Sequence, residues 1–250
     1  GQHEINLRYS DALEMADNHV VFKNGVKEIA HLEGQSATFM AKPFADQPGS
    51  SCHIHTSLWS LDGQTPLSPG DAGNGMSGEF RSFVAGLVNH LADVTLLGAP
   101  NINSYKRYQP ESWAPTATVW ALDNRTAGLR LVGTGPGLRI ESRIPGADAN
   151  PYLAFAGVIA AGLAGIEEGL DCGPPYDGNA YAAGAEGDTA LTHVPWNLPD
   201  ATEAFRNSEV AQKALGEDVM FHLAHGADEE WRAFHREVSD WEYRRGYERL

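Results

Sequence analysis

The sequence predicts an α+β fold in which an extended sheet with a polar face is backed by helices. Short stretches alternate apolar and polar residues with the two-residue period of a strand, and longer segments repeat apolar residues at helical spacing. A chain of 250 residues is also long enough to bury a large core, as one large domain or two small ones.

Strands are expected where alternating segments are bounded by turn-forming residues. In chain order these segments are residues 4–9, 37–43, 51–59, 116–123, 128–132 and 138–143. Within the third segment His53, His55 and Ser57 fall two residues apart, so a strand would place all three on one face. Residues 61–77 are rich in Gly, Pro, Asp and Ser and are expected to form a loop.

Helices are expected at residues 11–32, 78–97 and 150–166. The third of these begins with a good N-cap, Asn150, followed by proline at the first helical position, and Gly169 ends it. Because this segment is almost wholly apolar and small, we expect it to be buried.

The remainder of the chain has weaker patterns. Residues 172–199 are expected to form a long connecting region, and the last fifty residues suggest two helices. The second of these helices would carry four apolar side chains on one side, namely Trp231, Phe234, Val238 and Trp241.

Composition excludes several classes of protein. The chain has 18 Lys and Arg against 33 Asp and Glu, and a net charge of -15 repels nucleic acid and anionic membranes. Only Cys52 and Cys172 are present, which excludes a disulfide framework and a cysteine-rich zinc site. With no signal peptide and no long apolar run, we expect a cytoplasmic protein. The chain opens on Gly1 rather than Met, which suggests a fragment.

The segment L-R-I-E-S-R at 138–143 is the first candidate site. A strand would place Arg139, Glu141 and Arg143 on one face, as cation, anion and cation. Such a face suits a metal ion held between phosphate and carboxylate groups. A solvent-facing strand with cross-strand ion pairs is the alternative, and this segment alone does not decide between them.

Two histidines form the second candidate site. His53 and His55 would face the same way on their strand, and imidazole is a frequent ligand of divalent metals. Surface or packed histidines are the simpler interpretation of such a pair. Glu4 and Glu141 on neighbouring strands would turn the pair into a mixed carboxylate and histidine metal site.

Arginines are concentrated between residues 107 and 143 of an otherwise acidic chain, at positions 107, 125, 130, 139 and 143. This clustering suggests a site for a polyanion such as a nucleoside triphosphate, where charge neutralisation supplies much of the catalysis. The sequence contains neither a G-x-x-x-x-G-K-S/T loop nor a G-x-G-x-x-G element, so the usual phosphate-binding loops are absent from it.

Several motifs together resemble the catalytic domain of the glutamine synthetase family. They are G-Q-H-E at 1–4, A-K-P at 41–43, G-S-S-C-H-I-H-T-S-L at 49–58, N-S-Y-K-R at 103–107, D-N-R at 123–125, R-I-E-S-R at 139–143 and A-N-P-Y-L at 149–153. The resemblance implies that residues 1–250 form the carboxyl-terminal catalytic domain, with a curved antiparallel sheet whose polar face is the active site. It also implies that an amino-terminal β-grasp domain and further carboxylates lie upstream of Gly1.

The resemblance also assigns roles to individual residues. The metal-ligand positions are Glu4, His53 and Glu141. The nucleotide positions are His55, Ser57, Arg125, Arg130 and Arg139. The glutamate positions are Gly49, Arg107 and Arg143, and the catalytic positions are Arg107, Arg125 and Arg143.

The implied activity is a two-step ligation that uses ATP and two or three Mg²⁺ or Mn²⁺ ions. The side-chain carboxylate of glutamate attacks the γ-phosphate, and an amine then displaces phosphate from the acyl phosphate. The implied assembly is a homo-oligomer of stacked rings, a dodecamer, without nucleic acid or membrane partners.

The sequence departs from glutamine synthetases proper around the incoming amine. Trp113 stands where they have a flap glutamate that deprotonates ammonium, and an indole cannot accept a proton. Gln47-Pro48-Gly49 stands where the family usually has an asparagine before the glycine, and W-A-L-D-N-R at 120–125 is closer to the γ-glutamylpolyamine and γ-glutamylethanolamide synthetases. These departures favour an organic amine and place Trp113 among the substrate-binding residues. A true glutamine synthetase using ammonium and a non-catalytic structural or regulatory member are the alternatives.

One further position aligns with a known regulatory site of the family. Tyr181 aligns with the tyrosine that some bacterial glutamine synthetases modify by adenylylation. The residues that follow it, Ala182-Ala183-Gly184, do not match, so we predict that this modification does not occur.

Overall fold

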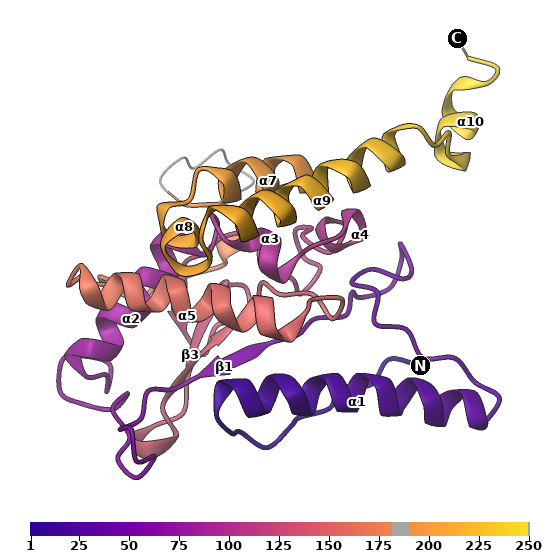
Figure 1. Ribbon diagram of the computed structural model, residues 1–250. Coiled ribbons are helices and arrows are strands. Elements are labelled where there is room, and N and C mark those ends of the chain that lie inside the picture. Colours follow the sequence, from indigo (N-terminus) through magenta and orange to yellow (C-terminus); the bar gives the residue numbers. More distant parts are fainter. Residues whose placement is uncertain (182–190, 250) are drawn as a thin grey trace.

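The computed structural model describes residues 1–181 and 191–249 and confirms the α+β class. Figure 1 shows helix α5 (Pro151–Glu167) between helix α1 (Ala12–Leu32) on one side and the layer of carboxyl-terminal helices on the other. The sheet lies next to α5, so the strands that carry the candidate site are supported from behind by helices.

The sheet has four strands in the order β1-β4-β3-β2. They are β1 (Ile54–Thr56), β2 (Trp120–Leu122), β3 (Leu129–Val132) and β4 (Arg139–Ser142). Strand β4 pairs antiparallel with both β1 and β3, whereas β2 and β3 are parallel, so the sheet is mixed rather than antiparallel throughout. Strands this short allow a parallel pair without a helical crossover, because the six residues between them can span the length of a three-residue strand.

Besides α5, the described residues after the expected loop form two longer helices and several short ones. They are α2 (Gly78–His90), α3 (Thr95–Gly98), α4 (Ile102–Tyr105), a 3-10 turn η1 (Gly135–Gly137), α7 (Leu198–Arg206), α8 (Glu209–Leu215), α9 (Glu217–His235) and α10 (Asp240–Gly246). Ser77 caps α2 by accepting a hydrogen bond from the Phe80 amide, and Asn150 caps α5 through the Tyr152 amide, as its sequence predicted.

Helices α2 and α5 pack closely because two glycines meet between them. A Cβ on Gly86 would lie 2.1 Å from the Ala161 carbonyl oxygen, and one on Gly165 would lie 2.1 Å from that of Ser82. Any larger residue would therefore push the two helices apart. This contact fixes the distance between α2 and α5 in the helix layer behind the sheet.

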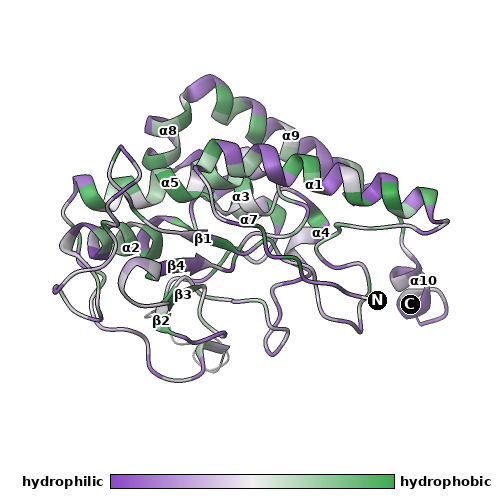
Figure 2. Cartoon of the chain, turned by 90° about the horizontal axis from the view of Figure 1, so that it is seen from below, coloured by the Kyte–Doolittle hydropathy of each residue, from purple (hydrophilic) through white to green (hydrophobic). Residues whose placement is uncertain are grey.

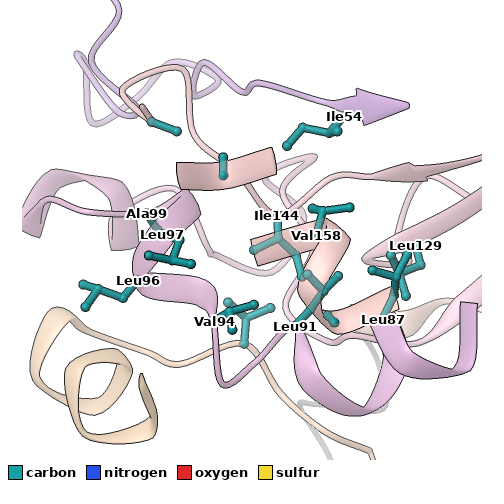
Figure 3. Packing of buried hydrophobic residues seen from close by; sticks show 14 of the residues in the cluster. Ile54, Leu87, Leu91, Val94, Leu96, Leu97, Ala99, Leu129, Ile144 and Val158 are labelled. Carbon is teal, nitrogen blue, oxygen red and sulfur yellow. The ribbon is translucent and has the colours of Figure 1, made fainter. Parts of the chain in front are cut away.

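The hydrophobic core fills the space between this helix layer and the apolar face of the sheet. Figure 3 shows Leu87 of α2, Leu91 directly after α2 and Val158 of α5 close to Leu129 of β3 and to Ile144 just after β4. Because alternate residues of each strand point into this core, the residues between them must face the other way.

Several predicted elements differ in the structure. Residues 4–9 and 37–43 are not strands, and the expected strand at 51–59 is reduced to β1 with isolated bridges at Ser51 and Trp59. The expected helix at 78–97 is broken after His90, and α3 begins at Thr95. Alternation alone predicted these strands, but each lacks the neighbouring strand that would complete a ladder.

The last fifty residues form more helices than the two predicted, α7 to α10, and the proposed apolar stripe is not continuous. Trp231 and Phe234 lie on α9, whereas Trp241 lies on α10 beyond a break, and Val238 and Trp241 are exposed. Figure 1 shows α10 standing apart from the rest of the chain. Figure 2 shows apolar residues along α1, of which Ala16 is buried but Leu13 and Val21 are exposed.

Within the described ranges, no helix combines the length and apolar character needed to cross a bilayer.

Candidate active site

Strand register places the polar residues of three strands in one row. His55 of β1 pairs with Glu141 of β4, and Glu141 pairs on its other side with Arg130 of β3. Their neighbours in sequence, such as Ile54 and Ile140, point into the core. The alternation predicted for L-R-I-E-S-R is therefore confirmed, and Glu141 lies at the middle of the row.

Glu141 is the carboxylate around which the other charged groups gather. Its side chain is 3% exposed, and its Oε1 lies 3.1 Å from His53 Nδ1 and accepts a 3.1 Å hydrogen bond from Arg143 Nη1. Its Oε2 accepts a hydrogen bond of 3.1 Å from Arg130 Nη1. The alternative of a solvent-facing strand with cross-strand ion pairs is therefore excluded, because this carboxylate is buried.

The electrostatics of Glu141 follow from these contacts. Burial alone would raise its pKa, but the hydrogen bond and charge of His53 and the charges of Arg143 and Arg130 outweigh burial and hold the pKa far below its usual value. Burial lowers the pKa of the Arg143 guanidinium, and the Glu141 charge opposes that shift. The cluster thus keeps a carboxylate ionised in a largely dry site.

Arg139 and His55 form a second pair at the outer end of the row. Arg139 Nε donates to His55 Nδ1 at 3.1 Å and Arg139 Nη1 donates to the Gly137 carbonyl at 3.0 Å. Burial lowers the pKa of His55, as do the charges of Arg139, His53 and Arg130, while Glu141 raises it. His55 is accordingly biased towards the neutral imidazole that accepts a hydrogen bond.

Arg130 is held from two sides. Its Nε donates to Asp123 Oδ1 at 2.9 Å, its Nη2 donates to the same oxygen, and its Nη1 reaches Glu141. Asp123 follows β2 directly and has a left-handed backbone with φ of +45°. The carboxylate of Asp123 therefore fixes the plane of the guanidinium beside Glu141.

Arg143 joins the sheet to the loop at 109–114. Its Nη2 donates to the Trp113 carbonyl oxygen at 3.3 Å. Trp113 itself has φ of +65° and a 64% exposed side chain, and Glu111 has φ of +61°. Two non-glycine residues in the left-handed region within one short loop cost backbone energy, and such strain clusters at functional sites.

Arg107 is buried against the end of β4. Its guanidinium donates to the carbonyl oxygens of Arg143, at 3.4 and 3.5 Å, and of Ile144, and it lies 5.0 Å from the centre of the Tyr108 ring. Its Nε has no hydrogen-bond partner among the described residues. Arg107 thus contacts the backbone of Arg143 and retains a donor without a partner in the described chain, while the role of both residues in binding glutamate stays a prediction.

Gly49 makes the position of Arg107 possible. A Cβ at residue 49 would lie 2.7 Å from Arg107 Cγ and 2.7 Å from the Ala41 carbonyl oxygen. The Gly49 carbonyl also accepts a hydrogen bond of 2.9 Å from Gln2 Nε2. The structure therefore brings Gly49 and Arg107 together and ties the amino-terminal segment to them.

The remaining predicted residues lie at the edge of this cluster or outside it. Ser57 accepts a 2.9 Å hydrogen bond from Trp59 Nε1, and Arg125 is exposed in the turn after β2, near enough to Arg143 to act on its charge. Glu4 lies in exposed coil, and no contact between it and Glu141 is recorded in the part of the chain that the structure describes. The roles of these three residues stay predictions.

The distance between the predicted metal ligands His53 and Glu141 shows whether both could bind one divalent cation. His53 Nδ1 and Glu141 Oε1 are 3.1 Å apart, close to the roughly 3 Å between adjacent ligands of an octahedral ion with bonds of ~2.1 Å. Two donors of the expected set therefore fit such an ion. No group of three or more His, Cys, Asp or Glu side chains gathers around one point within residues 1–181 and 191–249.

Two residues of the site were missed by the sequence analysis. Asp123 belongs to the D-N-R motif but was given no role, although its place directly after a strand that neighbours Arg130 was a usable signal. Tyr181 was considered only as a modification site, yet its side chain is buried, and burial raises the pKa of its phenol while the charges of Arg143 and Arg107 lower it. That burial supports the prediction that it is not adenylylated.

Comparisons with known proteins agree with this geometry. The family model described as the glutamine synthetase catalytic domain matches residues 1–246. A γ-glutamylethanolamide synthetase, GlnA4 of Streptomyces coelicolor, is 50% identical over 250 residues, which are 100% of this chain and 52% of that protein. A glutamine synthetase of Mycolicibacterium smegmatis is 39% identical over 97% of this chain and 55% of its own length.

A solved structure shares the fold. A complex of GmaS with ADP superposes with a TM-score of 0.88 at 36% identity, covering 97% of this chain and 56% of that one. The chain therefore spans about half the length of the proteins it matches.

Proposed function

The chain belongs to the glutamine synthetase family, and from this premise we propose that the protein uses ATP to ligate an organic amine to the γ-carboxylate of L-glutamate. In the first step the γ-carboxylate attacks the γ-phosphate of ATP and gives γ-glutamyl phosphate and ADP. In the second step the amine attacks the acyl carbon, the bond to the phosphate oxygen breaks, and an amide and phosphate are released. The enzyme is thus an ADP-forming glutamate–amine ligase.

The residues around Glu141 support the activation step. Arg130 and Arg143 flank Glu141 within hydrogen-bonding distance and would neutralise the charge that develops during phosphoryl transfer. Arg107, with its free Nε beside Arg143, is placed to hold the glutamate carboxylates. Arg139, which donates a hydrogen bond to His55, and Arg125 would bind the nucleotide phosphates.

His53 and Glu141 would hold a divalent cation in this proposal, with Glu4 and residues outside this chain completing its coordination. Such an ion supplies charge neutralisation at the γ-phosphate. The neighbouring Arg143 and Arg130 keep Glu141 ionised and in place for that role.

One observation carries the choice of an organic amine. The carbonyl oxygen of Trp113, in the loop at 109–114, accepts a hydrogen bond from Arg143, which in turn bonds Glu141. An indole can hold a cation against its face or line an apolar pocket for the carbon chain of an organic amine, which ammonium lacks, but it cannot accept the proton that ammonium or a protonated organic amine must lose before it attacks. Glu111 is exposed in the same loop, and its side chain is free in solvent. The name of the γ-glutamylethanolamide synthetase relative adds support.

Ammonium is the alternative acceptor, and the relative named glutamine synthetase supports it. Phosphate release from ATP and glutamate separates the proposals when the intact protein is supplied with ammonium, ethanolamine, a monoamine or a polyamine. We expect the fastest release with an organic amine. Fastest release with ammonium would contradict the proposal, and no release with any amine would favour a non-catalytic assembly.

Trp113→Glu is the matched test of the loop. We expect the ratio of kcat/KM for ammonium to that for the organic amine to rise by about 10²-fold, because a positioned general base contributes on that order. Trp113→Gln is the control, since it removes the indole without adding a base. If Trp113→Glu kept the ratio of the unaltered protein, Trp113 would not determine the acceptor; a ratio that rises equally in both variants would assign the effect to loss of the indole rather than to the added base.

The assembly is part of the same proposal. We propose a cytoplasmic homo-oligomer of stacked rings, a dodecamer, in which Mg²⁺ or Mn²⁺ accompanies ATP. Support comes from the family match over residues 1–246. Light scattering of the intact protein measures the mass, and a monomer would contradict this part of the proposal.

A further inference from the structure

Arg107 depends on a very short helix for its position. It lies just after α4, a helix of four residues, which is too short to be stable on its own. The conformation of this segment therefore has to be fixed by side chains that attach it to the rest of the protein.

Asn103 makes the first attachment of α4. The Lys42 amide donates to Asn103 Oδ1 at 2.8 Å, and Asn103 Nδ2 donates to the Lys42 carbonyl at 2.9 Å. These paired bonds hold α4 against the loop that leads to Gly49, the residue that lies against the Arg107 side chain.

Asp148 makes the second attachment, from the turn at 144–148 that follows β4. Ser104 Oγ donates to Asp148 Oδ2 at 2.6 Å, and Asn101 Nδ2 donates to the same oxygen at 2.9 Å. Ser104 is buried, and its Oγ also accepts a hydrogen bond of 3.0 Å from the Asn101 amide. One carboxylate oxygen thus holds both the residue that precedes α4 and a residue within it.

Asp148 can hold α4 because its own turn is firmly anchored. The Gly146 amide donates to the carbonyl of Gly98, at the end of α3, at 3.0 Å. Lys23 Nζ of α1 donates to the Ala147 carbonyl at 2.7 Å. A Cβ on Gly146 would lie 2.3 Å from Asp148 Oδ1, so the glycine leaves room for the carboxylate.

The same turn also receives the other end of the α4 segment. The Arg107 guanidinium and the Tyr108 hydroxyl both donate to the Ile144 carbonyl, the hydroxyl at 2.8 Å. Residues 101–108 are therefore fastened to one turn twice, through the Asp148 carboxylate at their beginning and through this carbonyl at their end. Loss of the first attachment would allow α4 to turn about the second, and Arg107 would move with it.

We infer that Asp148 is a positioning residue for the glutamate substrate, which acts through Ser104 and α4 on Arg107 and does not itself touch the substrate. This inference rests on the proposed function and extends the glutamate site by one residue. Asp148 Oδ1 is buried without a partner among the described residues, so Oδ2 alone carries the role. The role therefore requires a hydrogen-bond acceptor rather than a charge.

Asp148→Ala in the intact protein removes this acceptor. Phosphate release is measured with ATP, glutamate and an organic amine, each varied in turn. We expect KM for glutamate to rise about tenfold while kcat and KM for ATP change less than about twofold, because Arg107 keeps its bonds to Ile144 and shifts by less than the ~1 Å that costs 10²-fold in rate.

Asp148→Asn separates positioning from a general structural role. An asparagine whose Oδ1 takes the place of Oδ2 still accepts hydrogen bonds from Ser104 and Asn101, so we expect KM for glutamate to stay within about threefold of the unaltered protein. Ser104→Ala removes the same bond from its other side. In the double variant we expect Asp148→Ala to add little to Ser104→Ala, because residues of one hydrogen-bond network are not additive.

Ser208→Ala is the matched control for loss of a buried serine hydroxyl at a short helix. Ser208 is buried and caps α8 by accepting a 3.1 Å hydrogen bond from the Ala211 amide. We expect this variant to lower the melting temperature, as loss of a cap does, and to leave KM for glutamate unchanged.

Several results would overturn the inference while the proposed function stands. They are a KM for glutamate that Asp148→Ala leaves unchanged, a rise that is equal for glutamate and ATP, and a failure of Asp148→Asn to restore KM. Each would make Asp148 a residue of stability alone.

Failure of the proposed function gives a different result. Fastest release with ammonium would contradict the proposed acceptor but not this inference, because glutamate is the substrate in both reactions. If no amine supports release, calorimetry of glutamate binding to the intact protein replaces KM, and equal affinity in the unaltered protein and Asp148→Ala would overturn the inference. If the unaltered protein binds no glutamate, both the inference and the proposed function are wrong.

Discussion

The row of polar residues on the sheet and the loops that face it are built in opposite ways. On the sheet, His55, Glu141 and Arg130 are placed by strand register, and Glu141 is buried under paired charges. In the loops, Glu111, Trp113 and Asp123 adopt left-handed backbone conformations and their side chains reach solvent.

This difference matches a division of labour between activation and acceptor choice. Phosphoryl transfer needs charges held in fixed positions, and a sheet whose other face is a packed core supplies such positions. Choice of the amine can vary with a loop residue such as Trp113 without disturbing that core. Arg143 connects the two regions, since one guanidinium bonds both Glu141 and the Trp113 carbonyl.

The largest effect is expected on the sheet, at Glu141→Gln. This variant keeps the shape but leaves the buried Arg143 without its anion and Arg130 with Asp123 alone, which we expect to cost about 3 kcal/mol of unfolding free energy. We also expect phosphate release to fall by about 10³-fold. Thermal denaturation and the phosphate assay on the intact protein measure the two effects.

Glu33→Gln is the control for this change, because Glu33 is exposed just after α1. We expect it to stay within about 0.5 kcal/mol of the unaltered protein. An unchanged melting temperature in Glu141→Gln would mean that the charge cluster does not stabilise the polar face.

The same contrast explains what the sequence could predict. The alternation around Glu141 and the N-cap at Asn150 are local patterns, and both are confirmed. The helix predicted at 150–166 forms as α5, but it is buried on one face only, since Tyr152, Ile159 and Leu163 are exposed. The cluster on Glu141 contains His53 and Arg143 from the family motifs and Arg130 from outside them, whereas Glu4, predicted with His53 and Glu141, lies in exposed coil.

The features that the sequence could not predict depend on which strands pair with each other and on the conformation of loops. Residues 4–9 alternate as a strand would but have no partner strand, and β2 pairs parallel with β3, which no single-strand pattern reveals. The role of Asp123 depends on a turn that brings its carboxylate to the Arg130 guanidinium. The position of Tyr181 depends on the preceding residues, since the Gly178 carbonyl accepts a hydrogen bond from Asn124 and the Ala180 amide donates one to Thr126.

A smaller effect is expected where the two regions meet, at Gly49→Ala. The new Cβ would lie 2.7 Å from both Arg107 Cγ and the Ala41 carbonyl oxygen, so Arg107 has to move. A displacement of about 1 Å at a substrate-positioning group costs on the order of 10²-fold in rate. We therefore expect kcat/KM for glutamate to fall by about 10²-fold, with a loss of about 1–3 kcal/mol in stability.

Gly25→Ala is the matched control within α1, where a Cβ meets nothing within 4 Å. We expect it to leave activity unchanged and to stabilise the protein by about 0.5–1 kcal/mol, since alanine is the better helix former. If Gly49→Ala kept full activity, Arg107 would not need its observed position.

The smallest effect is expected at Asp123→Asn, in the loop that positions Arg130. Asparagine also tolerates a left-handed backbone, so the change removes the charge and leaves the turn intact. Arg130 then keeps only Glu141 as a charged partner and is free to rotate, and we expect KM for ATP to rise about threefold to tenfold with little change in stability. Asp228→Asn breaks a comparable pair with Arg206 between α9 and α7 and should leave KM for ATP unchanged. Equal KM values for ATP in the two variants would show that the sheet alone positions Arg130. Asp123 would then have no role in the site, and strand register would be sufficient to place His55, Glu141 and Arg130.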